Sequence, residues 1–555
     1  MTHHQWNPER PTLAIYGIQD CVKSDYPGFI HDHNMVLFHN GEVKKLVQLE
    51  RITRNKRDNK MHQHLVSLLR EEKLIGMELD VVFVDHEIGR AFISEDGQIR
   101  FEAPLKGELS SQPESGYLKW FDTKNRGWAL SHEMAHIATI LPFCGIWKEN
   151  SLHVHYDGGA SCSNFSVWHY KHGEINLVDA HWKNKEITSL HNANALTFAI
   201  VGAKRFDQNS VPGKIMGFGS FGKDLPEVRA WLRKHDYFKD IWRSKQLFFN
   251  KAEEEMGVKL NHFDLHHPLI QNIAASIQAE FEERLLNDLK HYKEITSATT
   301  LYYSGGCALN IKANSRIIEE NLFEEVVIPP CCEDSGLALG AGAWIEFLKH
   351  GTLKKHTAYL NNWGLPEKSY AYDASVIQRV AEGIMNGYVF ATCIGAGECG
   401  PRALGNRSII AKASSVEIAE KVSQYHKRRE WYRPIAPIML RSNAEKVIDG
   451  KIDDLSKYML LDYVIKPEYR KSLEGVTHVD NTSRIQYIDQ REENPFLYDL
   501  LTCLYQMYGE LALINTSFNQ QGEPIVHCYD QAITSAKNLK IDGVIGKGTL
   551  TLIDL

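Results

Sequence analysis

Short apolar runs alternate with amphipathic helical stretches along the whole 555-residue chain, and this alternation limits the folds open to it. The expected strands lie at residues 13–18, 35–43, 81–85, 196–203 and 300–306. The expected helices lie at residues 61–74 and 267–289. Such alternation predicts an α/β fold. The length predicts at least two domains, and no tandem repeat is visible.

A polar segment at residues 350–370 separates two parts of the chain. It contains Gly351 and Pro366, which are typical of a connector. We therefore expect one α/β domain over residues 1–355 and a second, rich in arginine, over residues 356–555.

The formal net charge of −7 argues against a nucleic-acid coat protein or a membrane-surface binder, since both carry a basic excess. The N-terminus lacks the pattern of a secretory signal, and no apolar run approaches the roughly 18 residues of a membrane span. Ten cysteines without a CxxC motif suit a reducing compartment. We expect a cytoplasmic protein with neither nucleic acid nor membrane as a partner.

The stretch SHEMAHIAT, residues 131–139, contains two histidines four positions apart. Ser131 can cap a helix, which places His132 and His136 one turn apart on the same face. Two imidazoles in this arrangement can bind one metal ion. The alternative is a helix that carries two histidines by chance, since the chain has 26 of them.

The same stretch spells H-E-x-x-H, the signature of zinc proteases. That function requires Glu133 as a general base and a third ligand farther along the chain. His153 and His155 follow, but on an expected strand that runs into a turn. The protease hypothesis therefore stays open on the residues alone.

Two glycine pairs follow expected strands, at Gly158-Gly159 and at Gly305-Gly306. Glycine lets backbone N–H groups approach a phosphate, and a helix N-terminus adds further donors. A single pair is usually only a tight turn, whereas two favour a two-lobed nucleotide cleft. Asp334 follows at a strand-to-helix junction, where a helix cap is the simpler interpretation.

Arginine and lysine occur in three stretches after residue 395, at positions 397–414, 426–440 and 477–486, and a fourth stretch, 513–526, adds Asn515, Ser517 and Asn519. Guanidinium groups beside glycine and proline suit phosphate, pyrophosphate or carboxylate. A solvated basic face is the alternative. Trp431 and Phe518 within these stretches favour a shaped pocket for an anion.

Together these stretches resemble the carbamoyltransferases that act on antibiotics and nodulation factors, the NodU/TobZ/CmcH family. The similar motifs follow the family's order and cover essentially the full chain: FIHDHNMVLFHNGEV, LERITRNKRDNK, SHEMAHIAT, YDGGAS, PGKIMGFGSFG, YSGGCALN, EDSGLALGAG, GECGPRALGNRS, HKRREWYRPIAP, THVDNTSRIQ and NTSFNQQGEPIV. The resemblance implies a sugar-kinase/actin-like two-lobed N-terminal domain for carbamoyl transfer. It implies a YrdC-like α/β C-terminal domain that forms carbamoyl-adenylate.

The resemblance also implies roles for individual residues. His132, His136 and Asp334 become ligands of Fe(II) or another divalent metal, which makes the H-E-x-x-H spelling a coincidence. The implied catalytic residues are His31, Asp32, Lys427 and Arg429. The implied cofactor-binding residues are Gly158, Gly159, Lys214, Ser304, Gly305, Gly306, Asn310, Arg402, Arg407, Arg433, Arg484, Asn515, Ser517 and Asn519.

The chain departs from the family pattern at several positions. Cys399 stands where the family usually has Phe, and Asn481 and Ser483 stand for Gly and Ala. Two further departures, His33-Asn34 and the extra residues 20–29, lie near the expected acceptor end. They bear on the acceptor more than on the chemistry.

The resulting expectation is an enzyme that makes carbamoyl-adenylate from carbamoyl phosphate and ATP with Mg. It then transfers the carbamoyl group to a hydroxyl or amine of a small-molecule natural product, and a homodimer is compatible with the resemblance. Three alternatives remain: a zinc protease, a threonylcarbamoyl-type tRNA-modifying enzyme, and a binding protein without activity. The acidic balance counts against the tRNA enzyme.

Overall fold

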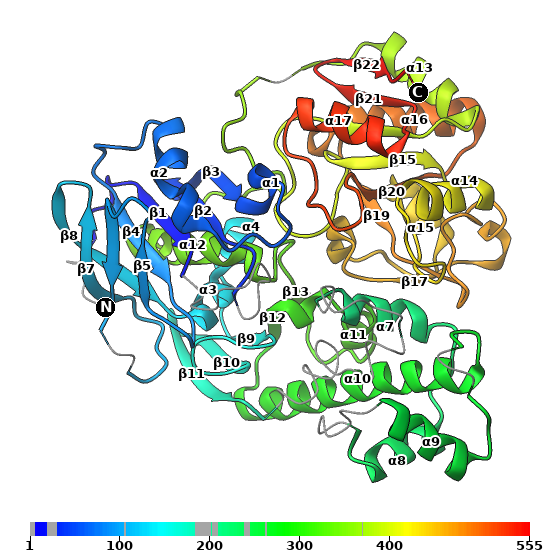
Figure 1. Cartoon of the computed structure of the whole chain (residues 1–555), viewed down its shortest axis with the longest axis horizontal. Coiled ribbons are helices and arrows are strands. Elements are labelled where there is room, and N and C mark those ends of the chain that lie inside the picture. Colours follow the sequence, from blue (N-terminus) through cyan, green and yellow to red (C-terminus); the bar gives the residue numbers. More distant parts are fainter. Residues whose placement is uncertain are drawn as a thin grey trace.

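The structure, a computed structural model, describes residues 6–18, 30–104, 107–183, 201, 209–237, 245–260, 264–368 and 370–554. It confirms the α/β class, with three large mixed sheets, of which the first lies at the left and the third at the upper right of Figure 1. The expected strand 196–203 lies outside the described residues except for residue 201, and so does the extra segment 20–29. Among the described helices, none is long and apolar enough to cross a membrane.

The first sheet has eight strands in the order β3-β2-β1-β4-β8-β7-β6-β5. Their bounds are β1 Thr12–Tyr16, β2 Asn34–His39, β3 Glu42–Gln48, β4 Asp80–Val84, β5 Ala91–Ile93, β6 Ile99–Glu102, β7 Glu114–Trp120 and β8 Thr123–Leu130. Helices α1 (Leu49–Thr53) and α2 (Met61–Glu71) follow β3, and α2 ends three residues before the expected helix does.

The second sheet has five strands in the order β11-β10-β9-β12-β13. Their bounds are β9 Ser151–Tyr156, β10 Phe165–Lys171, β11 Glu174–His181, β12 Thr300–Ser304 and β13 Glu325–Val327. Its order and strand directions repeat those of β3-β2-β1-β4-β8: an antiparallel pair of hairpin strands, then parallel neighbours. The two N-terminal lobes therefore share one topology, although no repeat is visible in the sequence.

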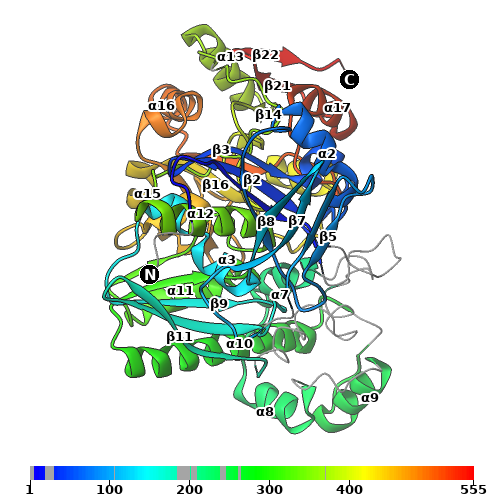
Figure 2. The ribbon, with the colours of Figure 1, turned by 90° about the vertical axis from the view of Figure 1, so that its left-hand side faces the viewer.

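Helices separate and cover the two sheets, as Figure 2 shows in side view. Helix α12 (Leu337–His350) packs on β1 and β2, and α3 (His132–Ala138) packs between α12 and strands β9 and β12. The long α10 (Pro268–Thr296) covers the other face of the second sheet, where Phe281 stacks on Tyr156. The other helices that the structure describes in this part are α4 Leu141–Cys144, α7 Val211–Gly219, α8 Pro226–Lys234, α9 Lys245–Met256 and α11 Ile311–Glu319.

The third sheet has seven strands in the order β19-β16-β20-β15-β14-β21-β22. Their bounds are β14 Phe390–Cys393, β15 Ser408–Lys412, β16 Ala436–Leu440, β19 Gln486–Ile488, β20 Ala512–Ser517, β21 Gly543–Gly546 and β22 Thr549–Leu552. The helices around it are α13 Ala374–Met385, α14 Val416–Glu420, α15 Arg441–Val447, α16 Pro495–Tyr508 and α17 Tyr529–Leu539, and β17 Tyr463–Val464 pairs with β18 Thr482–Ser483.

The expected connector at residues 350–370 bonds to both parts of the chain. Asn361 exchanges backbone hydrogen bonds with Gly397, and Asn362 donates to the Leu46 carbonyl. Trp363 is fully buried beside the α2 core. Tyr432 and Met459, from the part of the chain after residue 356, belong to the apolar cores of the two N-terminal lobes. The two parts of the chain therefore pack directly on one another.

Candidate functional site

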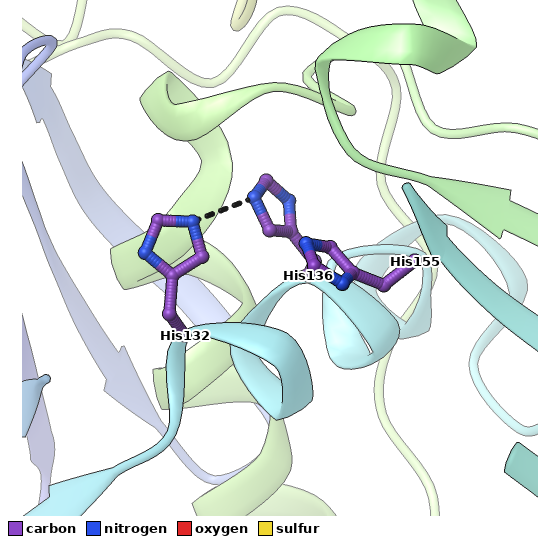
Figure 3. A group of neighbouring side chains, drawn as sticks. All are labelled: His132, His136 and His155. Atoms are coloured by element: carbon purple, nitrogen blue, oxygen red, sulfur yellow. Dashed lines mark hydrogen bonds between the residues drawn. The ribbon is translucent and has the colours of Figure 1, made fainter. Parts of the chain in front are cut away.

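Helix α3 begins as the sequence predicts, since the Ser131 hydroxyl accepts a hydrogen bond from the Met134 N–H. This cap starts the helix at His132 and aligns His136 one turn later. Both imidazoles are fully buried, and their Nε2 atoms lie 3.0 Å apart (Figure 3). Asp334, in the short turn before α12, brings its Oδ1 to 3.5 Å from each of these nitrogens.

These separations fit one metal ion. Nitrogen and oxygen ligands lie about 2.0–2.2 Å from a divalent transition metal, so neighbouring ligands around it are about 3.0–3.5 Å apart. Burial opposes ionisation of Asp334, but His132, His136 and His31 outweigh it and hold the pKa of this carboxyl well below its usual value. The donor set therefore suits the metal that the sequence led us to expect.

Two donors outside the expected ligand set lie at the end of β9. The Asp157 Oδ2 is 3.5 Å from His136 Nε2 and accepts a 2.5 Å hydrogen bond from the Gly306 N–H. His155 stacks on His136, with ring centroids 5.0 Å apart (Figure 3). The signal that was available is the spacing His155-x-Asp157, which puts both side chains on one side of a strand.

Glu133 has a structural environment. Its Oε1 accepts hydrogen bonds from the backbone N–H groups of Cys162 and Ser163 and from the Ser163 hydroxyl, at 2.6, 3.0 and 3.1 Å. A carboxylate so engaged fixes the turn after β9. These bonds give Glu133 a structural role, which counts against its use as the base of a zinc protease.

His31 lies next to the cluster of His132, His136 and Asp334. Its Nδ1 is 2.9 Å from Asp32 Oδ2 and 3.7 Å from Asp334 Oδ2. Burial lowers the pKa of His31, but the bond to Asp32 and the charge of Asp334 outweigh it and raise that pKa to about 9. Asn34 donates to the Asp334 carbonyl at 2.8 Å and so ties the two segments together.

The two glycine turns follow neighbouring parallel strands of one sheet, because β12 pairs with β9 despite their distance in the sequence. Gly305 has φ 96° and the backbone of Tyr156 2.2 Å from where a Cβ would stand, so only glycine fits there. Ser304 is the last residue of β12, and Gly306 contacts the Asp157 carboxylate.

A second cluster gathers around the end of β20. The buried Lys427 ammonium donates to the carbonyl and side-chain oxygens of both Ser517 and Asn519, and the Ser517 hydroxyl donates to Asn519 Oδ1 at 2.7 Å. Arg428 adopts φ 50°, and after this sharp turn Arg429 also reaches Ser517 Oγ, at 3.4 Å. The predicted pairs Lys427/Arg429 and Ser517/Asn519 therefore meet.

Three more arginines crowd this cluster: Arg402, Arg433 and Arg484. Burial and the neighbouring cations Arg402, Arg429 and Arg433 hold the pKa of Arg484 well below its usual value. Burial and Arg433 likewise lower the pKa of Arg429 to about 9. The Nε atoms of Arg402 and Arg484 have no hydrogen-bond partner among the described residues. Such an excess of cations favours an anionic ligand.

Other expected cofactor-binding residues have structural partners. The Arg407 guanidinium is 1% exposed and donates five hydrogen bonds to the carbonyls of Ile394, Gly395, Asn406 and His527, so it does not face the cluster. Lys214 pairs with Glu430 at 2.8 Å. Asn310 caps α11 and bonds to Gln278. Asn515 donates to Gln486 and Ala403.

One continuous cavity of about 1460 Å³ connects the two clusters. At one end its lining includes His31, Asp32, Asp157, Gly158, Gly159, Gly306 and Asp334, and at the other Arg402, Lys427, Arg429, Arg433, Arg484, Asn515, Ser517 and Asn519. Segment 54–60 lines the cavity between them. Arg54 of this segment donates to the carbonyls of Pro524 and Ile525, which anchors it across the cavity.

Comparison with known proteins places both clusters in one family. The family model for the carbamoyltransferase N-terminus matches residues 113–343, which include His132, His136 and Asp334. The model for the carbamoyltransferase C-terminus matches residues 381–551, which include the arginine-rich stretches. The chain belongs to the carbamoyltransferase family. It is therefore a transferase by family, as the sequence led us to expect.

Relatives of this carbamoyltransferase include nodulation proteins. It is 24% identical to nodulation protein NolNO of Sinorhizobium fredii over 93% of this chain and 78% of that protein. It is 33% identical to nodulation protein U of the same species, over 56% of this chain and 58% of that protein. Full-length HypF in its phosphate- and nucleotide-bound form aligns with a TM-score of 0.34 and 11% identity, over 60% of this chain and 55% of that one. This structural likeness is too low to support further inference.

Proposed function

We propose that this carbamoyltransferase makes carbamoyl-adenylate from carbamoyl phosphate and ATP, and then transfers the carbamoyl group to a hydroxyl or amine of a small-molecule natural product. The observation that carries the proposal is the single cavity that joins an excess of cations to a histidine–carboxylate cluster. We assign activation to residues 356–555 and transfer to residues 1–355.

At the cation end, water attacks carbamoyl phosphate and the bond to its phosphate group breaks, which leaves carbamate and inorganic phosphate. A carbamate oxygen then bonds to the α-phosphorus of ATP while the bond to the β-phosphate breaks, so pyrophosphate leaves. Lys427, Arg429 and Arg484 are positioned to neutralise the charge that spreads over the phosphates, with Mg²⁺ accompanying ATP. Burial and mutual repulsion lower the pKa values of these three groups, and bound phosphate would offset both.

The intermediate is a mixed anhydride that water destroys, so a route inside the protein protects it. Segment 54–60 lies along that route. Burial, Arg429 and the nearby Lys56 all lower the pKa of Lys427. Arg57 in turn acts to lower the pKa of His31. These two cations are therefore placed to attract the adenylate phosphate as it moves between the ends.

At the other end, the Gly158-Gly159 and Gly306 turns offer backbone donors to the adenylate phosphate. His132, His136 and Asp334 would hold a divalent metal, with Fe(II) as our first candidate, and this ion would polarise a carbonyl or phosphate oxygen. His31, oriented by Asp32, would orient the acceptor group through a hydrogen bond, since its raised pKa keeps the ring protonated near neutral pH.

Pyrophosphate release that depends on carbamoyl phosphate tests the proposal. Lys427→Ala and Ser517→Ala should lose it by about 100-fold or more, since one charge-assisted contact to a buried phosphate is worth several kcal/mol. His132→Ala should keep it. Changes below about threefold in both of the first two variants would place activation elsewhere.

A further inference from the structure

We propose that His155 is a third imidazole ligand of the metal centre, beside His132, His136 and Asp334. The inference rests on the proposed function, because it extends the metal site assigned there. It concerns a residue that lies outside the two-histidine, one-carboxylate set.

The strand β9 sorts its side chains by alternation. Leu152, Val154 and Tyr156 point into the apolar core beneath α10. His155 and Asp157 therefore share the opposite side, which is the side on which α3 packs. A helix that offers two histidines four residues apart and a strand that offers two donors two residues apart meet at one point.

The distances place His155 at the edge of the site. Its ring centroid lies 5.0 Å from that of His136 and 6.2 Å from that of His132 (Figure 3). One nitrogen from each of the three rings lies within 4.8 Å of the others. Ligands on opposite sides of an ion with bonds of about 2.1 Å are about 4.2 Å apart, so His155 needs to move inward by less than about 1 Å.

The hydrogen bonding of His155 fits a ligand. Its Nδ1 lies 3.3 Å from the Ser166 hydroxyl, which also accepts a 3.1 Å hydrogen bond from the Trp168 indole. Histidines that bind metals through one nitrogen usually donate the other N–H to such a partner. The buried Nε2 of His155 has no hydrogen-bond partner in the part of the chain that the structure describes, which leaves its lone pair for an ion.

His153 provides the contrast on the same strand. It is equally buried and also faces away from the apolar core, but its Nε2 bonds to the Ser151 hydroxyl at 2.9 Å and its ring stacks on Tyr302. Its Nδ1 is also buried without a hydrogen-bond partner among the described residues, so the two histidines differ in position: His155, and not His153, groups with His132 and His136. His153→Ala is therefore a matched control for His155→Ala.

A third imidazole has a consequence for the metal. Imidazole suits Fe, Zn, Ni and Cu, whereas carboxylates and water suit Mg, Ca and Mn. Three nitrogens and a carboxylate would make this site more selective for the first group than the two-histidine set is.

The test is Co(II) binding to the full chain, measured by competition with a chelator and by the visible absorption of bound Co(II). His155→Ala and the milder His155→Gln should weaken Co(II) binding by at least about 10-fold and change the spectrum. His153→Ala should do neither. Wild-type affinity and spectrum in both His155 variants would overturn the inference, as would equal losses in the His153 and His155 variants.

A third arm separates this inference from the metal site itself. If His132→Ala abolishes Co(II) binding while the His155 variants retain it, His155 is not a ligand but the assigned site stands. If His132→Ala also retains wild-type binding, the metal site of the proposed function fails, and this inference with it.

Discussion

The crowded arginines around Arg484 should lower the free energy of unfolding of the ligand-free chain, because their charges repel one another. Replacing one of them tests this directly. Arg484→Met removes a cation whose burial and whose neighbours Arg402, Arg429 and Arg433 all oppose its charge. Methionine keeps much of the volume and apolar contact. We expect this variant to be inactive in pyrophosphate release and at least as stable as the wild type.

The size of the effect follows from Coulomb's law. Two like charges about 7 Å apart repel by about 2 kcal/mol at an effective dielectric constant near 20. Arg484 has three cationic neighbours against one carboxylate, Asp462, and solvent screens part of this because the side chain is only partly buried. We therefore expect Arg484→Met to raise the free energy of unfolding by about 1 kcal/mol, which would raise the Tm of a domain of this size by about 2–4 °C.

Arg407→Met is the matched control, since it makes the same substitution at a nearby arginine. The five hydrogen bonds of Arg407 satisfy four buried carbonyls, and their loss should cost at least about 3 kcal/mol. Its Tm should therefore fall by about 6 °C or more.

Calorimetry of the ligand-free chain measures both variants, and added pyrophosphate should raise the Tm of the wild type but not of Arg484→Met. A fall in Tm for Arg484→Met as large as that for Arg407→Met would refute the reasoning. Pyrophosphate release within about threefold of the wild type would refute it as well.

Three other predictions concern the remaining parts of the site. His132→Ala or Asp334→Ala should lose bound metal, measured by elemental analysis, and carbamoyl transfer, measured by product assay. Glu133→Gln should keep transfer, because Gln Oε1 can still accept the bonds from Cys162 and Ser163. Inactivity of Glu133→Gln alone would contradict this. Lys56→Ala or Arg57→Ala should raise the ratio of AMP to carbamoylated product above one, because the adenylate escapes, and an unchanged ratio would remove segment 54–60 from the route. His527 is buried and donates to the Trp363 carbonyl, and burial lowers its pKa to about 4. In the unfolded chain the His527 imidazole binds a proton below about pH 6.5, whereas in the folded chain it stays neutral to about pH 4. This difference should lower the free energy of unfolding by about 2 kcal/mol at pH 5. His527→Gln should therefore flatten the decline in Tm between pH 7 and 5.

Spacing within a single element was predictable from the sequence. Ser131, His132 and His136 lie on one short helix, whose cap and periodicity fix their geometry. The pairs Lys427/Arg429 and Ser517/Asn519 were expected from the family resemblance, and they meet at the end of β20.

Partners distant in the sequence were not predictable. Arg407 resembles the other arginines in its local sequence, but its carbonyl partners come from residues 394–395 and 527 as well as its neighbour. Nothing in the local sequence of the two glycine turns reveals that they follow neighbouring strands, because β12 pairs with β9 from far along the chain. For the same reason the nearness of His155 to His136 is visible only in the folded chain.

The central claim is that the intermediate passes from one end of the cavity to the other within one chain. Mixing Lys427→Ala with His132→Ala tests it most directly, because each variant lacks one half-reaction, with an acceptor first identified by mass spectrometry of its carbamoyl adduct. We predict that the mixture makes little carbamoylated product, although His132→Ala alone releases pyrophosphate. Product formation near the wild-type rate would show that the intermediate diffuses freely or crosses a subunit interface, and would contradict the account.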